Sequence, residues 1–335
     1  MSIATRASTA LVGGIPLGIF LLWGAIDGGY PPTLWMPGAL ALVGLLALLL
    51  FGVPQLLRSL PRVPLVGLAL FAAYTVWSGL SIAWAGDKGE AWDAANRTLL
   101  YLVVYAIFLL WPWRARHGAM LLAAYALGVA GIAAVSFVAA LHSADPYAFF
   151  VGGRYSEPVG YINANCALFL SAVWPAVFLA SRRETPWWLR GLFLASAGFL
   201  LQQAVLPQSR GSLFVFPVVA VLYLALVPGR ARSLLTLGPV CLATLLVRGP
   251  LLDVYSAARG DFLPEALGAL EEPFIGSAAA LLVLGTIYGL VDRYAPLPSD
   301  LARLGRWILG IATGLAAFIA VLVLLVAYGL SLIHI

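Results

Sequence analysis

Charged residues are scarce in this chain, at only 10% of its 335 residues, whereas 62% are hydrophobic. A soluble protein carries about 25% charged residues, and so little charge cannot cover a water-exposed surface of this size. A disordered chain needs low hydrophobicity and high net charge, so that class is excluded as well. The composition therefore predicts an all-α, polytopic transmembrane helical bundle, in which lipid replaces water around most of the surface.

Cysteine, histidine and lysine are also nearly absent. The chain has two cysteines, three histidines and a single lysine, Lys88. Cys166 and Cys241 both lie inside apolar runs, so neither a disulfide nor a metal site is expected. We find no histidine or cysteine cluster at metal-ligand spacing and no glycine-rich nucleotide loop. The basic residues are not clustered. We therefore expect no metal, no cofactor and no nucleic-acid partner.

Apolar runs near the length that crosses about 30 Å of hydrocarbon as a helix recur along the whole chain. They predict eleven spans in a single membrane domain over residues 1–335: Ala10–Ile26, Met36–Val53, Leu65–Ala83, Thr98–Trp113, Gly118–Leu141, Ala164–Ser181, Gly191–Pro207, Ser212–Val227, Leu234–Val247, Phe274–Val291 and Trp307–Leu330.

The charges of the connecting segments predict the orientation. If the N-terminus is cytoplasmic, thirteen of the 19 basic residues lie on the inner side: Arg6, Arg58, Arg62, Arg114, Arg116, Arg182, Arg183, Arg190, Arg230, Arg232, Arg293, Arg303 and Arg306. The acids divide the opposite way, since only Glu184, Asp292 and Asp300 of 14 are inside. This asymmetry follows the positive-inside rule and predicts a cytoplasmic N-terminus.

The interiors of the predicted spans contain almost no ionisable side chains. Ion-coupled transporters generally need such groups near the middle of the membrane, so the pattern disfavours that class. A functional site is therefore expected at a membrane face, and three segments of the outer face stand out.

The first outer segment leads directly into the sixth predicted span. Gly152 and Gly153 give the backbone freedom beside Arg154. Asn163 and Asn165 can cap the following helix or donate to an anionic ligand. An ordinary polar turn with an asparagine cap explains the same residues.

The second outer segment, Gln208–Gly211, is a short hairpin between the seventh and eighth predicted spans. Ser209 is placed to cap the eighth span, whose positive dipole end would then face outward beside Arg210. This combination favours a phosphate or pyrophosphate group, although snorkelling of Arg210 to the lipid headgroups explains it equally well. Gln202 and Gln203 make the preceding helix end polar.

The third outer segment, Arg248–Pro273, is the longest and holds several acids. Acid–acid or acid–arginine pairs there could act in acid/base chemistry. A solvated amphipathic surface helix, Asp261–Leu270, explains the same charges and is the interpretation we favour.

Taken in order on one membrane face, Gly153-Arg154, the run from Gly160 to Asn165 and Ser209-Arg210-Gly211 resemble the motifs of the O-antigen ligase/polymerase family. The resemblance covers about residues 144–227, and the rest of the chain is similar only in hydropathy and span order. It implies a multi-pass protein of the bacterial inner membrane that transfers a glycan from an undecaprenyl-diphosphate carrier to a glycan or lipid acceptor at the external face.

External arginines of that family hold the carrier pyrophosphate. The resemblance therefore implies this role for Arg154 and Arg210, with Ser209, Asn163 and Asn165 as supporting donors. Arginine suits a phosphate group and stabilises a leaving group without bound metal. The related shape, elongation and division polymerase family uses the same kind of donor, so membership of such a neighbouring branch remains an open alternative.

One departure from the family concerns its large external loop, which often carries a histidine implicated in catalysis. Here the longest outer segment, Arg248–Pro273, has no histidine, and the chain stops at Ile335 while still apolar. This predicts a C-terminal truncation within residues 307–335. We expect these 335 residues to hold the carrier half of a site without its acceptor half, and to have no transferase activity alone.

Two other functions remain open. A transporter or flippase for a lipid or glycan would line a cavity with cations across the bilayer, whereas these arginines lie at span ends. A structural or assembly protein would leave Arg154 and Arg210 as snorkelling residues without a ligand.

Overall fold

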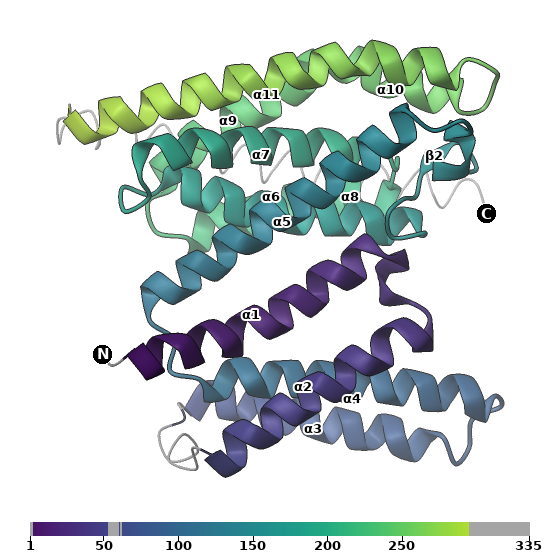
Figure 1. Ribbon diagram of the computed structural model, residues 1–335, viewed down its shortest axis with the longest axis vertical. Helices are drawn as coiled ribbons and strands as arrows, with labels where there is room; N and C mark the ends of the chain where they lie inside the picture. The colour runs from purple at the N-terminus through teal and green to yellow at the C-terminus, as the bar shows by residue number, and fades with distance from the viewer. Residues whose placement is uncertain (1–2, 53–59, 61, 295–335) are drawn as a thin grey trace. The chain divides into compact units, whose positions relative to one another are not determined.

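The computed structural model describes residues 3–52, 60 and 62–294, with side chains from residue 9 onward. Its helices, shown in Figure 1, are α1 (Ile3–Ala25), α2 (Pro32–Gly52), α3 (Arg62–Ser81), α4 (Lys88–Leu110), α5 (Ala115–Leu141), α6 (Ile162–Ser181), α7 (Trp187–Val205), α8 (Arg210–Leu226), α9 (Arg230–Leu246), α10 (Arg248–Ala257) and α11 (Leu263–Tyr294). The short elements are η1 (Asp27–Gly29), η3 (Pro146–Phe149), β1 (Phe150–Val151) and β2 (Arg154–Tyr155). The described residues are therefore all-helical in their regular structure, apart from one two-residue strand pair.

Six helices of the described residues are long and apolar enough to cross a membrane, namely α2, α3, α4, α5, α6 and α11. Helices α9 and α10 together pass the same test but are bent by 49°. Each of the first ten predicted spans overlaps a helix of the structure. The eleventh, Trp307–Leu330, and the predicted truncation lie outside the described residues. The number eleven and the side of the N-terminus stay predictions.

The chain divides into two compact units. Unit 1 comprises residues up to Trp23 and Gly29–Leu121, and unit 2 comprises Gly24–Gly28 and the chain from Leu122 onward. Each unit has its own packing and is described separately.

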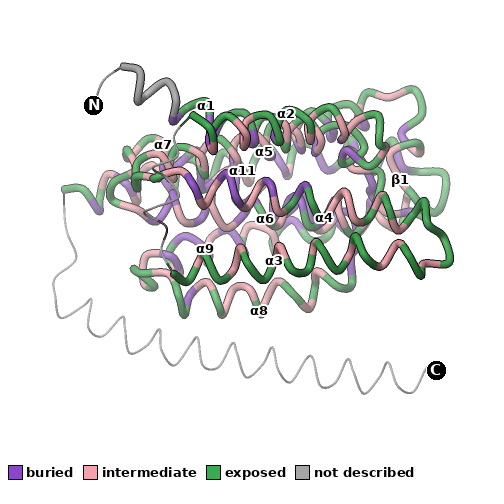
Figure 2. The backbone as a smooth tube through the Cα atoms, turned by 90° about the horizontal axis from the view of Figure 1, so that it is seen from below, coloured by how far each residue is buried: buried purple, intermediate pink, exposed green. Residues whose placement is uncertain are grey.

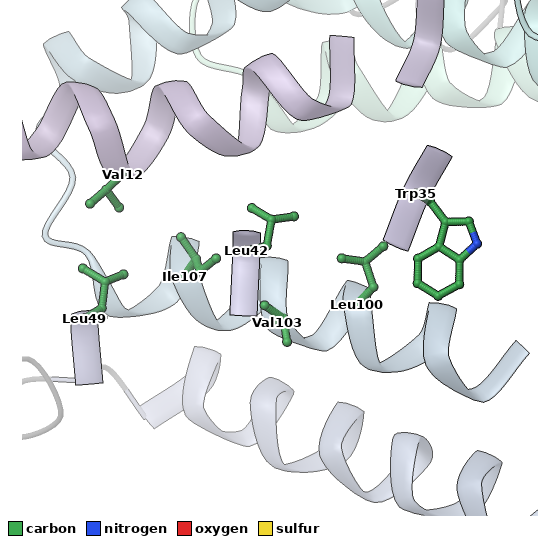
Figure 3. Packing of buried hydrophobic residues seen from close by; sticks show 7 residues of the cluster. All are labelled: Val12, Trp35, Leu42, Leu49, Leu100, Val103 and Ile107. Atoms are coloured by element: carbon green, nitrogen blue, oxygen red, sulfur yellow. The ribbon is translucent and has the colours of Figure 1, made fainter. Parts of the chain in front are cut away.

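Unit 1 is held together by a small apolar cluster (Figure 3). Its buried members come from α1, α2 and α4: Val12, Trp35, Leu42, Leu49, Leu100, Val103 and Ile107. The α2 members recur every seven residues and so share one face of the helix. Helix α3 packs on α4, yet none of its residues is buried, as Figure 2 shows. Such exposure of an apolar helix is expected where lipid is the solvent.

In unit 2, α7 packs against both α6 and α11. Gly191 of α7 lies so close to α11 that a Cβ there would be 2.4 Å from the Leu282 carbonyl oxygen. Gly285 and Gly289 of α11 approach the α7 backbone in the same way. Small residues allow helices to pack backbone to backbone in a membrane, so these glycines explain the closeness of α7 and α11.

Two contacts show which loops of unit 2 lie together at the same end of its helices. Tyr147 donates to the Gly260 carbonyl oxygen (2.8 Å) at the end that holds the start of α11. Arg183 and Asp292 pair at the other end, 2.9 Å apart. Each pair joins residues that the charge pattern predicts on the same side of the membrane. We therefore call these the outer end and the inner end of unit 2.

The predicted outer segment Arg248–Pro273 is largely helical, and α10 is the part that the sequence did not indicate. Its first part forms α10. The predicted surface helix Asp261–Leu270 is helical from Leu263 onward, but it is not separate, because α11 begins at Leu263 and runs unbroken for 32 residues, with Pro273 inside it. Membrane helices tolerate proline where neighbouring groups satisfy the freed backbone, so Pro273 is not the boundary that the sequence suggested.

Candidate site at the outer end of unit 2

Arg154 lies in a tight hairpin made by β1 and β2. The strands pair antiparallel with Val151 opposite Arg154, and Gly152 and Gly153 have φ angles of 59° and 76°. A two-residue turn with both angles positive has type I′ character and favours glycine. The pair of glycines therefore forms the hairpin that presents Arg154, whose side chain is half-buried.

Hydrogen bonds join this hairpin and the start of α6 to the turn between α7 and α8. The Tyr155 amide donates to the Leu206 carbonyl oxygen (3.4 Å). The Ser209 hydroxyl donates to Asn163 Oδ1 (2.9 Å), across 46 residues of sequence. The structure therefore brings the two motifs of the family resemblance together.

Ser209 is the N-cap of α8, as predicted. Its Oγ accepts from the Ser212 amide (3.3 Å) and from the Ser212 hydroxyl (3.0 Å). Arg210, the first residue of α8, is exposed. Arg210 thus adds a positive charge to the end of α8 where the helix dipole is positive, a combination that attracts anions.

The two asparagines take different places, and neither caps α6. The N-cap is Tyr161, which makes no side-chain cap bond, because the helix begins before both asparagines and leaves them in its first turns. Asn163 is exposed beside Ser209. Asn165 is fully buried, and its Nδ2 donates to the Glu157 carbonyl oxygen (2.8 Å). Asn165 anchors the loop before α6, and its contact with a ligand stays a prediction.

Buried amides lie below this surface. Gln202 and Gln203, which make the end of α7 polar, are fully buried. Gln202 Oε1 accepts from the Ser277 hydroxyl of α11 (3.0 Å). Neither polar atom of the Gln203 side chain nor Asn165 Oδ1 has a hydrogen-bond partner in the described residues. Such groups are normally satisfied by protein, water or ligand.

Arg259 is a cation beside the hairpin to which sequence reasoning gave no role. A Cβ at Gly153 would lie 2.6 Å from Arg259 Cγ and 3.2 Å from its Nε. The Arg259 guanidinium lies 4.3 Å from the Tyr255 ring centroid, and the Tyr147 contact with Gly260 holds this loop against η3. Nothing in the local sequence shows that Gly153 and Arg259 lie close together, so sequence reasoning could not identify Arg259 as part of this region.

Two titratable groups of the hairpin and its loop are perturbed. Burial raises the pKa of Tyr155, whose hydroxyl is hydrogen-bonded to Ser136, so this phenol remains protonated at neutral pH. Burial, and then the charge of Asp27, raise the pKa of Glu157 above its ordinary value near 4.5.

Stability is therefore expected to fall slightly, through Glu157, as pH rises above about 4.5. Above pH 4.5 the folded state binds more protons at Glu157 than the unfolded state does, so deprotonation disfavours folding. Glu157→Gln should flatten this part of the pH profile in thermal unfolding in detergent. Glu265→Gln, at an exposed site on α11, is the control, and an unchanged slope in Glu157→Gln would contradict the expectation.

No group of three histidine, cysteine or acidic side chains that could hold a metal ion occurs in the part of the chain that the structure describes. Comparison of the chain with protein-family models, curated proteins and solved structures finds no match. The functional argument therefore depends on the geometry of the outer end and on the family resemblance of its motifs.

Proposed function

We propose that this membrane protein is a glycan transferase of the O-antigen ligase/polymerase type, which acts at the outer face of the bacterial inner membrane. Its donor is a glycan on an undecaprenyl-diphosphate carrier, and its acceptor is a glycan or a lipid. Arg154 and Arg210 hold the carrier pyrophosphate, and Ser209, Asn163 and Asn165 support them.

The hydrogen bond from Ser209 to Asn163 is the observation that carries the proposal. It joins two motifs that are far apart in sequence, and the Tyr155 amide, next to Arg154, bonds to the turn that precedes Arg210. A pyrophosphate needs several donors on one surface, and arginine supplies them in a rigid fork. The α8 N-terminus adds a positive dipole at the same place.

The proposed transfer needs no metal. The acceptor hydroxyl oxygen bonds to the anomeric carbon of the donor sugar, while the bond from that carbon to the diphosphate oxygen breaks. The diphosphate leaves with the bonding electron pair, and the acceptor proton passes to a base or to water. Arg154 and Arg210 lower the barrier by stabilising the charge that develops on the leaving diphosphate.

Donor binding tests this proposal on the chain itself. Purified protein in detergent is titrated with undecaprenyl diphosphate, with undecaprenyl monophosphate as the comparison. We expect Arg154→Gln and Arg210→Gln each to weaken diphosphate binding by about tenfold or more, because a hydrogen bond to a charged group contributes about that much. Arg248→Gln, at an exposed position of the third outer segment, is the matched control.

Unchanged affinity in both the Arg154 and Arg210 variants would exclude the pyrophosphate site. Movement of labelled carrier lipid across proteoliposome membranes, lost in the same variants, would instead favour the flippase alternative.

A further inference from the structure

The inner end of unit 2 gathers far more positive than negative charge. Its acids in the described residues are Glu184 and Asp292. Its basic residues lie between α6 and α7, in the first turns of α7 and α9, and at the end of α11: Arg182, Arg183, Arg190, Arg230, Arg232 and Arg293. The charge pattern assigned these residues a role in orientation alone.

Three of the arginines converge on the Asp292 carboxylate. Arg183 donates from Nε (3.2 Å) and Nη2 (2.9 Å). Arg190 donates from Nη1 (3.1 Å), and Arg232 Nη2 lies 3.6 Å from Oδ1. A single carboxylate neutralises only one of these three charges, so the group keeps a net charge of about +2.

Buried donors of this group are left without an acceptor. Arg190 is 2% exposed and its guanidinium lies 4.5 Å from the Tyr288 ring centroid, but its Nη2 has no hydrogen-bond partner among the described residues. The Arg182 Nε is buried and equally without a partner. An unpaired buried donor on a charged group is costly. The group therefore has spare donors as well as spare charge.

Two helix N-termini add to the positive potential. Helix α7 begins after Pro186 and α9 after Gly229, and neither N-cap makes a side-chain cap bond. Neither helix has an acid in its first turn, where Asp and Glu are usually favoured, and α9 begins with Arg230 and Arg232 instead. Free backbone N–H groups thus occur at the same end as the arginines.

Part of the group is exposed, and its surroundings are those expected at the depth of lipid headgroups. Arg183 and Arg232 side chains are 43% and 38% exposed, whereas the Asp292 side chain is 4% exposed. Trp187 and Trp188 begin α7, and tryptophan marks the membrane interface. Exposed apolar side chains continue from this level along the helices: Leu192, Leu226, Leu235 and Val291.

We propose that the exposed Arg183 and Arg232, positioned by Asp292 and the buried Arg190, form a binding site for a phosphate group, that of an anionic phospholipid headgroup. Phosphate oxygens accept from the free guanidinium donors, and the phosphate charge offsets the positive excess. Basic pockets between membrane helices recognise lipid headgroups in this way. The inference does not depend on the proposed function at the outer end.

The test uses the purified full chain in dodecyl maltoside. One arm adds dioleoyl phosphatidylglycerol, a second adds dioleoyl phosphatidylcholine, and a third adds inorganic phosphate. Native mass spectrometry counts bound lipid, and intrinsic tryptophan fluorescence follows the thermal midpoint. We expect phosphatidylglycerol to bind and raise the midpoint, and phosphatidylcholine to do neither.

Arg232→Gln is the informative variant, because Arg232 lies beyond hydrogen-bond distance of Asp292 and its loss leaves the Arg183 and Arg190 bonds in place. It should weaken phosphatidylglycerol binding by about tenfold, and Arg183→Gln should do the same. Arg116→Gln, an exposed arginine predicted on the same membrane side, should bind as the unmodified chain does.

A response to inorganic phosphate alone, lost in Arg232→Gln, would overturn the lipid as the source of the phosphate. Binding that is unchanged in Arg183→Gln and Arg232→Gln, or equal binding of both lipids, would overturn the site.

Discussion

Asp292→Asn is expected to lower the free energy of unfolding by about 3–5 kcal/mol, the usual cost of removing one partner from a buried ion pair. Asp292 accepts hydrogen bonds from Arg183 and Arg190, and the Arg190 side chain is only 2% exposed. The amide leaves this guanidinium without a counter-charge in a place that water does not reach. The variant keeps the size of the side chain, so the loss reports charge and not volume.

Reversible unfolding in mixed detergent and sodium dodecyl sulfate micelles, followed by circular dichroism, measures this loss. Asp93→Asn is the matched control, because Asp93 pairs with Arg97 at 2.8 Å while both side chains remain more than 25% exposed. Surface pairs contribute about 0–1 kcal/mol. Equal losses in the two variants would show that burial of the Asp292 ion pairs adds nothing to the free energy of unfolding.

A double-mutant cycle with Arg190→Gln separates the ion pair from other effects. If the two groups stabilise each other, Arg190→Gln together with Asp292→Asn costs less than the sum of the single losses. Additive losses would contradict the pairing of Arg190 with Asp292.

The membrane helices were largely predictable, because hydropathy over about 20 residues is a local property. The runs that begin near Met36, Leu65 and Gly118 correspond to α2, α3 and α5. Predictions failed where three-dimensional context decides the outcome. Pro273 suggested a break, whereas α11 continues through it. Hydropathy indicated the end of a span at Val247, but not that α10 follows there at a bend of 49°.

At the outer end, the sequence indicated a local feature, the cap of α8, and not the long-range contacts. Spacing indicated Ser209 as a helix cap, which the Ser212 bond confirms. The partner of Ser209 is Asn163, 46 residues away, and no local pattern specifies such a pair. The ion pairs of Asp292 were even less predictable, because Arg183 and Asp292 are 109 residues apart.

The packing of α7 on α11 predicts the second large effect. Gly191→Ala is expected to lower the free energy of unfolding by at least about 2 kcal/mol, near the upper part of the range for overpacked interiors. The new Cβ would be 2.4 Å from the Leu282 carbonyl oxygen and 3.1 Å from the Thr286 amide nitrogen. These are backbone atoms, so no side-chain rotation relieves the clash and the helices must separate.

Gly276→Ala on the same α11 is the matched control, with the opposite sign. Its Cβ would meet no heavy atom within 4 Å, and alanine in a helix interior is favoured over glycine by about 0.5–1 kcal/mol. The same micelle unfolding assay compares the two variants.

Because Arg190 precedes Gly191 and its carbonyl oxygen lies 3.1 Å from a Cβ built at Gly285, separation of the helices should also pull Arg190 from Asp292. Gly191→Ala should then abolish most of the coupling between these two residues, and a stable variant with full coupling would refute the close packing.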